Sequence, residues 1–321
     1  MAGGCELREL QNINAKRKNS ILELLRFLFA LWVLYYHSFV PFKFSLFGDG
    51  FLAVEFFFVL SGFFLVRSID KYTAMPLKSG LLEFIKHRFQ AIAIPFIIGE
   101  IFVLIYSLPG EISVNYFFGY LWYIRDLFIA MTCVFLLRKY AKNERIFYLT
   151  VAAASAVALF GFGWSSIMAW PGGPFRSAAA MPLGMLAALI PKISVKRGDK
   201  AHRGPSTVIS AIGFFAVGAG CLAIIAMPEK SDALMYCLVI LGYPALIYFA
   251  SCIDLNYGFL NWLGSLSFPI YSFQCILRVI EVWGLKDQGI LFIILIGLVL
   301  LFSLTTHLIG LKSKRDSLHA Q

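Results

Sequence analysis

The chain has 321 residues, of which 60% are hydrophobic and 14% charged, with a mean hydropathy of +0.78 and a formal net charge of +10. These values exclude an ordinary soluble domain, in which roughly half of the residues are apolar and about a quarter are charged. They also argue against nucleic-acid binding, because the lysines and arginines are spread between apolar runs and do not gather on one face or tail. We therefore expect a membrane protein whose apolar side chains largely face lipid.

Apolar runs of membrane-spanning length recur along the whole chain. A bilayer core of roughly 30 Å needs about 20 apolar residues per helix. The runs predict an all-α polytopic membrane protein of about ten transmembrane helices, near 21–41, 51–69, 84–107, 115–137, 146–162, 175–191, 207–227, 232–252, 259–282 and 289–311. The fifth and sixth are the shortest, and Pro182 is expected to kink the sixth.

The first run has the basic flank of a signal peptide. It contains three ionisable residues, Glu23, Arg26 and His37, and no small-residue cleavage site follows it, so we expect a retained helix. The six cysteines have no CxxC spacing, which gives no sign of a disulfide framework or a zinc site. We expect them to be small packing residues and expect no metal.

The loop charges predict the orientation of the chain. Cytoplasmic loops carry an excess of Lys and Arg. With the N-terminus inside, the predicted outside segments hold only Lys43, Arg176, Lys230 and Lys286, and nearly all other basic residues fall inside. Both termini are therefore predicted to be cytoplasmic. We divide the chain into a short tail at 1–20, one membrane domain at 21–311 and a short tail at 312–321.

Ionisable residues within membrane helices are costly to bury and are candidates for function. Arg26 and His37 are eleven residues apart, close to three helical turns, so both project from one face of the first helix and lie roughly 16 Å apart along its axis. Histidine exchanges a proton near neutral pH, which suits general-base work on a hydroxyl. The alternative is a histidine that bonds to a neighbouring helix.

The second helix carries Glu55 near the same predicted depth as His37. A carboxylate there would orient the imidazole and stabilise its charged form. The alternative is a hydrogen bond between helices with no catalytic meaning. Ser61 and Gly62 follow on this helix, and such a small pair more often permits close packing than it supplies a nucleophile.

The sequence resembles acyltransferase family 3, the bacterial membrane proteins that acylate sugars of surface glycans. Arg26 and His37 match the family's basic-residue, ten-spacer, histidine motif. Four further segments match in order: 54–63 (VEFFFVLSGF), 86–95 from Lys-His-Arg to Ile-Pro, 121–128 (LWYIRDLF) and 263–271 (LGSLSFPIY). The chain departs from the family pattern at Ile92, where a second arginine is usual, and at Gln274, where a histidine is usual.

The resemblance implies an acyl-CoA donor, most often acetyl-CoA, on the cytoplasmic side of the bacterial inner membrane. It implies a hydroxyl of a cell-surface or lipid-linked saccharide as acceptor. Arg88, Lys86 and Arg26 are then expected to bind the CoA phosphates. His37, held by Glu55, is expected to act as the base, and Arg125 to stabilise the oxyanion.

Some alternatives stay open at the level of sequence. Arg125 has a competing role as an internal partner of Glu100 or Asp126. A transporter or flippase also places charges at mid-membrane, although no inverted repeat is visible. An accessory subunit without activity is a third interpretation, favoured by Ile92 and Gln274. The oligomeric state and the choice between direct transfer and an acyl-enzyme are not predicted.

Overall fold

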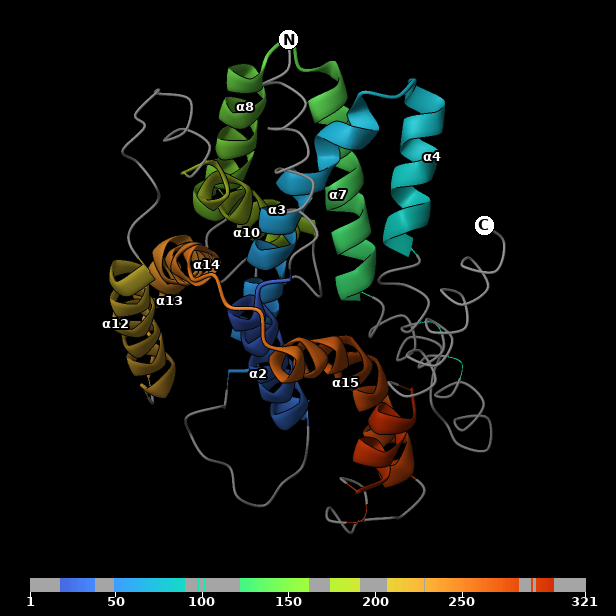
Figure 1. The fold of residues 1–321 in the computed structure, drawn as a ribbon, viewed down its shortest axis with the longest axis vertical. Coiled ribbons are helices and arrows are strands. Elements are labelled where there is room, and N and C mark those ends of the chain that lie inside the picture. The colour runs from blue at the N-terminus through green and yellow to red at the C-terminus, as the bar shows by residue number, and fades with distance from the viewer. Residues whose placement is uncertain are drawn as a thin grey trace.

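The computed structural model describes residues 18–37, 49–89, 97, 101, 122–161, 174–190, 207–227, 229–282, 290 and 293–302. Every regular element within these ranges is a helix, as predicted (Figure 1). In chain order they are α2 (Ser20–His37), α3 (Phe51–Thr73), α4 (Leu77–Arg88), α7 (Trp122–Tyr140), α8 (Glu144–Ala156), the π-helix η3 (Val157–Gly161), α10 (Pro174–Ala187), α12 (Thr207–Ala226), α13 (Asp232–Cys237), the π-helix η4 (Leu238–Gly242), α14 (Tyr243–Cys252) and α15 (Gly258–Val282).

The helices coincide with most of the predicted spans. The span predicted at 232–252 is one helical stretch made of α13, η4 and α14, and the span at 146–162 corresponds to α8 and η3. The predicted start of the third span at residue 84 is wrong, because α4 already begins at Leu77. Most of that span lies outside the described residues, whereas a helix over Ile293–Phe302 falls within the tenth.

Four stretches among the described residues are long and apolar enough to cross a membrane: Ser20–His37, Phe51–Thr73, Thr207–Ala226 and Asp232–Cys252. The third of these, α12, buries only 17% of its apolar window inside the protein. The apolar side chains of such a helix, mostly uncovered by protein, are explained by contact with lipid. The protein is therefore an all-α membrane protein.

Helix α3 runs through the centre of the bundle, and 72% of its apolar window is buried (Figure 1). Its closest neighbour is α10, because two glycines let the backbones meet. A methyl group at Gly62 would collide with the carbonyl oxygen of Met181, and one at Gly184 would collide with the carbonyl oxygen of Val59. The sequence predicts that the Ser61-Gly62 pair permits close helix packing, and Gly62 has this role in the contact with α10.

Helix α10 continues through Pro182. A proline inside a helix removes one backbone hydrogen bond and leaves carbonyl groups of the preceding turn exposed. The hydroxyl of Ser155 on α8 donates to the carbonyl of Ala179 in that turn at 2.6 Å. A hydroxyl from a neighbouring helix thus satisfies part of the interrupted turn.

Helices α2 and α15 pack closely along their length. A methyl group at Gly264 would overlap the backbone and side chain of Glu23. Asn19 fixes the start of this pair, because its Oδ1 caps α2 by accepting from the backbone N–H of Leu22 at 3.1 Å. Its Nδ2 donates to the carbonyl of Ile253 at 2.8 Å, just ahead of α15. The pairing of α2 with α15 is therefore fixed at the helix ends as well as along the interface.

Candidate active site

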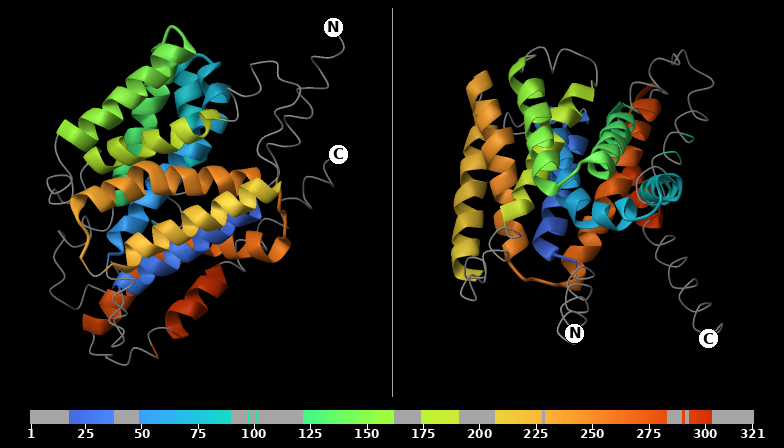
Figure 2. Two further views of the ribbon diagram at one scale, coloured as in Figure 1. Left: turned by 90° about the vertical axis from the view of Figure 1, so that its left-hand side faces the viewer. Right: turned by 90° about the horizontal axis from the view of Figure 1, so that it is seen from above.

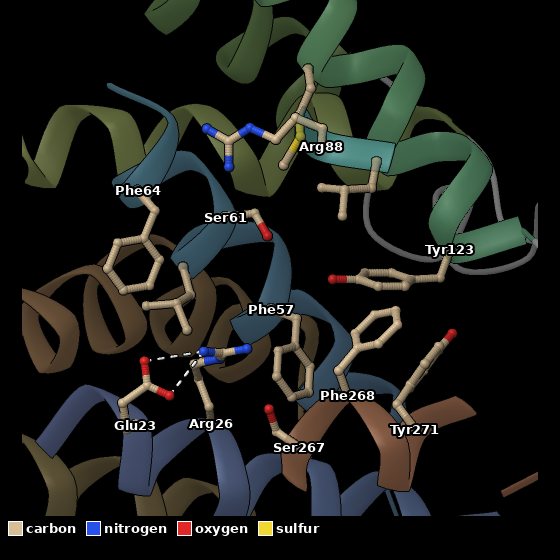
Figure 3. Close-up of a pocket in the computed structure, with 13 residues that line it drawn as sticks. Glu23, Arg26, Phe57, Ser61, Phe64, Arg88, Tyr123, Ser267, Phe268 and Tyr271 are labelled. Carbon is tan, nitrogen blue, oxygen red and sulfur yellow. Dashed lines mark hydrogen bonds and ion pairs between the residues drawn. The ribbon is translucent and has the colours of Figure 1, made fainter. Parts of the chain in front are cut away.

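A cavity of about 350 Å³ opens between five helices, α2, α3, α4, α7 and α15 (Figure 3). Its volume lies within the range of small-molecule sites, about 300–1,000 Å³. The residues that line it are Glu23, Arg26, Phe57, Leu60, Ser61, Phe64, Arg88, Tyr123, Leu127, Met131, Ser267, Phe268 and Tyr271. Each of the five segments that carried the family resemblance contributes at least one side chain to this list.

Arg26 and Glu23 form one wall of the cavity. They lie one helical turn apart on α2, and Nη1 of Arg26 donates to both carboxylate oxygens of Glu23, at 3.1 and 2.9 Å. The side chain of Glu23 is held against Gly264 of α15, where no other residue would leave room for it. The α2–α15 contact thus fixes Glu23, and Glu23 orients the Arg26 guanidinium (Figure 3).

Arg88 reaches the cavity from the opposite end (Figure 3). Its Nη2 donates to the hydroxyl of Ser68 at 2.5 Å, and its guanidinium carbon lies 5.7 Å from the centre of the Phe84 ring. Its Nε is buried and has no hydrogen-bond partner within the described part of the chain. A buried donor without a partner costs free energy, so this group is available to a ligand acceptor.

Hydroxyl and aromatic groups lie between the two arginines. The hydroxyls of Ser61 and Tyr123 point into the cavity, and Ser267 lies near Arg26 (Figure 3). The Tyr123 ring packs against Phe58 at 4.8 Å and against Tyr271 at 5.3 Å between centroids, which fixes the direction of its hydroxyl. The cavity therefore joins two cationic ends through a wall of aromatic rings and neutral donors.

The predicted site residues divide into two groups. Arg26 and Arg88 come together at the cavity, whereas His37, Glu55, Arg125 and Lys86 do not line it. His37 is partly buried at the end of α2, three turns beyond Arg26. Lys86 lies 3.9 Å from Glu83 on the exposed side of α4, with both side chains half exposed.

Arg125 is half exposed and pairs with its neighbour on α7. Its Nε lies 3.0 Å from Oδ1 of Asp126. Of the two internal partners left open by the sequence, Asp126 is the one observed, and Glu100 lies outside the described residues. Asp126 is fully buried, and its Oδ2 has no hydrogen-bond partner among the described residues.

Glu55 is held by Arg176, which the sequence predicts to lie at the outer face of the membrane. Nε of Arg176 donates to Oε1 of Glu55 at 2.6 Å, and Nη2 donates to the carbonyl of Phe51 at 3.1 Å. The Arg176 guanidinium also lies 4.7 Å from the centre of the Trp122 ring. Through these contacts Arg176 of α10 is joined to α3 and α7. The predicted orientation of His37 by Glu55 stays a prediction.

A sequence signal for Arg176 was present. The residue lies at the start of an apolar run, and the predicted topology places both this end and Glu55 near the outer face. Opposite charges at one depth in a membrane usually pair. Ser61, Tyr123 and Ser267 lie in segments that match the family. The sequence does not indicate that they meet at one cavity, because this depends on the packing of α3, α7 and α15.

The described residues hold no group of three or more His, Cys, Asp or Glu side chains arranged to bind a metal ion. The site as described is made of two arginines, the Glu23 carboxylate, hydroxyl groups and aromatic rings, with a net positive charge. Such a set binds and orients an anionic ligand through hydrogen bonds and ion pairs.

Comparison with known proteins gives one match. A family model described as "Acyltransferase domain" matches residues 19–308, which is nearly the whole chain. Neither the curated proteins nor the solved structures contain a match.

Proposed function

Because the chain belongs to acyltransferase family 3, we propose that it transfers an acyl group from cytoplasmic acyl-CoA to a hydroxyl of a cell-surface or lipid-linked saccharide. Acetyl is the expected group. The proposed location is the bacterial inner membrane, with about ten membrane-spanning helices in residues 21–311 and both short tails in the cytoplasm. No metal takes part in the proposed reaction.

The observation that carries this proposal is the cavity between Arg26 and Arg88. Two arginines and one glutamate leave it with a net positive charge. CoA carries several phosphate charges, and arginine binds phosphate through paired N–H donors. The Nε of Arg88, which has no hydrogen-bond partner among the described residues, provides such a donor. We assign Arg88, Arg26 and the nearby Lys86 to the donor.

The proposed topology places this cavity toward the cytoplasm. Arg26 lies near the start of α2, whereas His37 ends the same helix, roughly 16 Å further along its axis. The basic end of the site then faces cytoplasmic CoA and His37 faces the acceptor side. The aromatic wall at Tyr123 and Phe57 suits the pantetheine arm and the acyl chain as they extend between the two.

The proposed reaction is direct transfer. His37 accepts the proton of the sugar hydroxyl as its oxygen attacks the thioester carbonyl. The carbon–sulfur bond then breaks, and the CoA thiolate leaves and takes up the proton. We assign Glu55 to the stabilisation of the charged His37. The proposed donors to the oxyanion are the guanidinium of Arg125 and the hydroxyl of Tyr123.

Replacement of His37 tests this function. A strain that lacks the protein is complemented with the parent, with His37→Ala or with the neighbouring control Tyr36→Phe, and its surface glycans are examined by mass spectrometry. We expect the acyl group to be present with the parent and the control, and to be lost with His37→Ala, at least about 100-fold, because general-base catalysis contributes 10²–10⁴. Normal acylation with His37→Ala would rule out the proposed role.

The purified protein provides a second readout that separates this proposal from glycan transport. With acetyl-CoA and a glycan acceptor in detergent, we expect release of free CoA thiol by the parent and not by His37→Ala. Glycan movement in vesicles without thioester consumption would favour a transporter. Comparable yield and elution volume of the variants exclude misfolding as the cause.

A further inference from the structure

Helix α4 is packed into the protein through one face only. Gly80, Phe84 and Arg88 recur every four residues and form this face. Gly80 lies against the carbonyl of Tyr72, where a methyl group would not fit, and the Phe84 ring stacks on Phe135 with 5.1 Å between centroids. Of the other side chains of α4, only that of Leu81 is partly buried, and the rest are exposed and form the uncovered part of the helix.

The uncovered part includes an apolar stripe. Leu82, Ile85 and the directly following Phe89 are 64%, 36% and 41% exposed. Together with Lys78 they fall within an arc of about 60° at 3.6 residues per turn. Three large apolar side chains in line on the exposed side of a helix are unfavourable in water.

Basic side chains border this stripe, and the nearby carboxylates are already paired. Lys71 and Lys78 are exposed at the α3–α4 turn, and Lys86 follows on the adjacent polar face. Glu83 lies 3.9 Å from Lys86, and Asp70 lies 2.9 Å from Arg138 on α7. The surface around α4 is therefore positively charged beside an apolar stripe.

The orientation of α4 is fixed relative to a membrane-spanning helix. A short turn joins it to α3, and Nζ of Lys139 on α7 donates to the carbonyls of Thr73 and Met75 in that turn, at 2.8 and 2.6 Å. These are carbonyls that the end of α3 leaves without helical partners. In the left view of Figure 2, α4 (cyan) stands across the common direction of α2, α12 and α14.

We propose that α4 is an interfacial helix that docks on anionic phospholipids of the leaflet at which α3 ends. Leu82, Ile85 and Phe89 insert among the acyl chains, and Lys71 and Lys78 contact the phosphate groups, with the Lys78 stem lying along the apolar stripe. An apolar stripe bordered by lysines fits an anionic membrane surface, which attracts each basic residue close to it.

This docking surface has a consequence for the cavity. Arg88 ends α4 on its packed face, about 90° around the helix from the centre of the lipid stripe, and its guanidinium lines the cavity. Lipid that holds the stripe thus holds Arg88 in place. The inference rests on α3 as a membrane-spanning helix and does not require acyl transfer, so its test does not depend on the proposed function.

Quenching by brominated lipid tests the proposal on the whole protein. Nanodiscs contain equal amounts of phosphatidylglycerol and phosphatidylcholine, with bromine on only one of the two lipids, and the fluorescence of an added tryptophan is read against the parent. For Leu82→Trp we expect at least about twofold stronger quenching by brominated phosphatidylglycerol than by brominated phosphatidylcholine. With Lys71→Gln and Lys78→Gln added, we expect the ratio to fall to about one.

Two matched positions complete the test. Ile212→Trp, 64% exposed on the lipid-facing helix α12, is expected to be quenched equally by both lipids. Ser79→Trp, on the polar face of α4, is expected to be quenched weakly by either. Equal quenching of Leu82→Trp by the two lipids would overturn the preference for anionic lipid, and no quenching would overturn docking on lipid altogether. If Leu82→Trp is quenched equally by the two lipids, or not at all, while thioester turnover persists, the lipid proposal is wrong and the proposed acyl transfer is unaffected.

Discussion

The ion pair between Glu55 and Arg176 is the most deeply buried charged contact among the described side chains, with 2% and 6% of the two side chains exposed. Removal of one partner of such a pair leaves an uncompensated charge. We expect Arg176→Ala to lower the free energy of unfolding by roughly 3–5 kcal/mol, measured by titration with sodium dodecyl sulfate in mixed micelles.

The same measurement has an internal control. Asp70 pairs with Arg138 near the surface and is half exposed, so Asp70→Asn is expected to cost at most about 1 kcal/mol. The double variant Arg176→Ala with Glu55→Ala is expected to cost less than the sum of the two single changes, because no charge is then left alone. If Arg176→Ala costs no more than Asp70→Asn, the buried pair contributes no more to stability than the exposed one.

At the residue scale, the sequence predicted charges better than it predicted their partners. Arg26 and Arg88 were identified from their motifs, and both line the cavity. Glu55 was identified as a buried carboxylate, but its observed partner comes from α10, 121 residues away. The depth of a charged residue in the membrane can be predicted from its position along a helix. Its partner cannot, because the partner depends on which helices pack together.

At the element scale, glycines decide how closely helices approach. We expect Gly184→Ala to destabilise the protein by at least about 1–3 kcal/mol, because its methyl group meets the backbone carbonyl of Val59 and the helices must separate. Since Ser61 and Phe57 line the cavity from α3, we also expect weaker acetyl-CoA turnover. Thermal unfolding in detergent and release of CoA thiol check the two effects.

A second glycine separates packing from helix propensity. Gly220 on α12 has no atom within 4 Å of the position of an added methyl group. Gly220→Ala is therefore expected to be neutral or to stabilise the protein by up to about 1 kcal/mol, the difference in helix propensity. A loss at Gly220→Ala as large as that at Gly184→Ala would mean that the close approach of α3 and α10 is not the cause.

Helix positions followed from the sequence because length and hydropathy are local properties. The runs at 207–227 and 259–282 agree with α12 and α15 to within a residue at each end. The early start of α4 at Leu77 was missed because its mixed apolar and charged residues do not form an apolar run. The pairing of α2 with α15 was also not predicted, since it depends on a small residue, Gly264, that faces Glu23 only in the folded chain.

At the scale of the whole molecule, the proposed reaction requires two sides. The donor arginines lie toward one end of α2 and His37 lies at the other, so transfer across the bilayer follows only if the basic loops are cytoplasmic. The loop charges predict this arrangement. Two exposed loop residues, Lys142 between α7 and α8 and Glu229 between α12 and α13, report on it directly.

Three predicted spans, two of them the shortest in the chain, lie between Lys142 and Glu229, so an odd number of crossings must place these residues on opposite faces. In a variant without the six native cysteines, we expect Glu229→Cys to react with a membrane-impermeant maleimide in intact cells. We expect Lys142→Cys to react only after lysis. Reaction of both in intact cells would mean that one of the short helices, α8 or α10, does not cross. The loop charges would then no longer predict on which side of the membrane His37 lies.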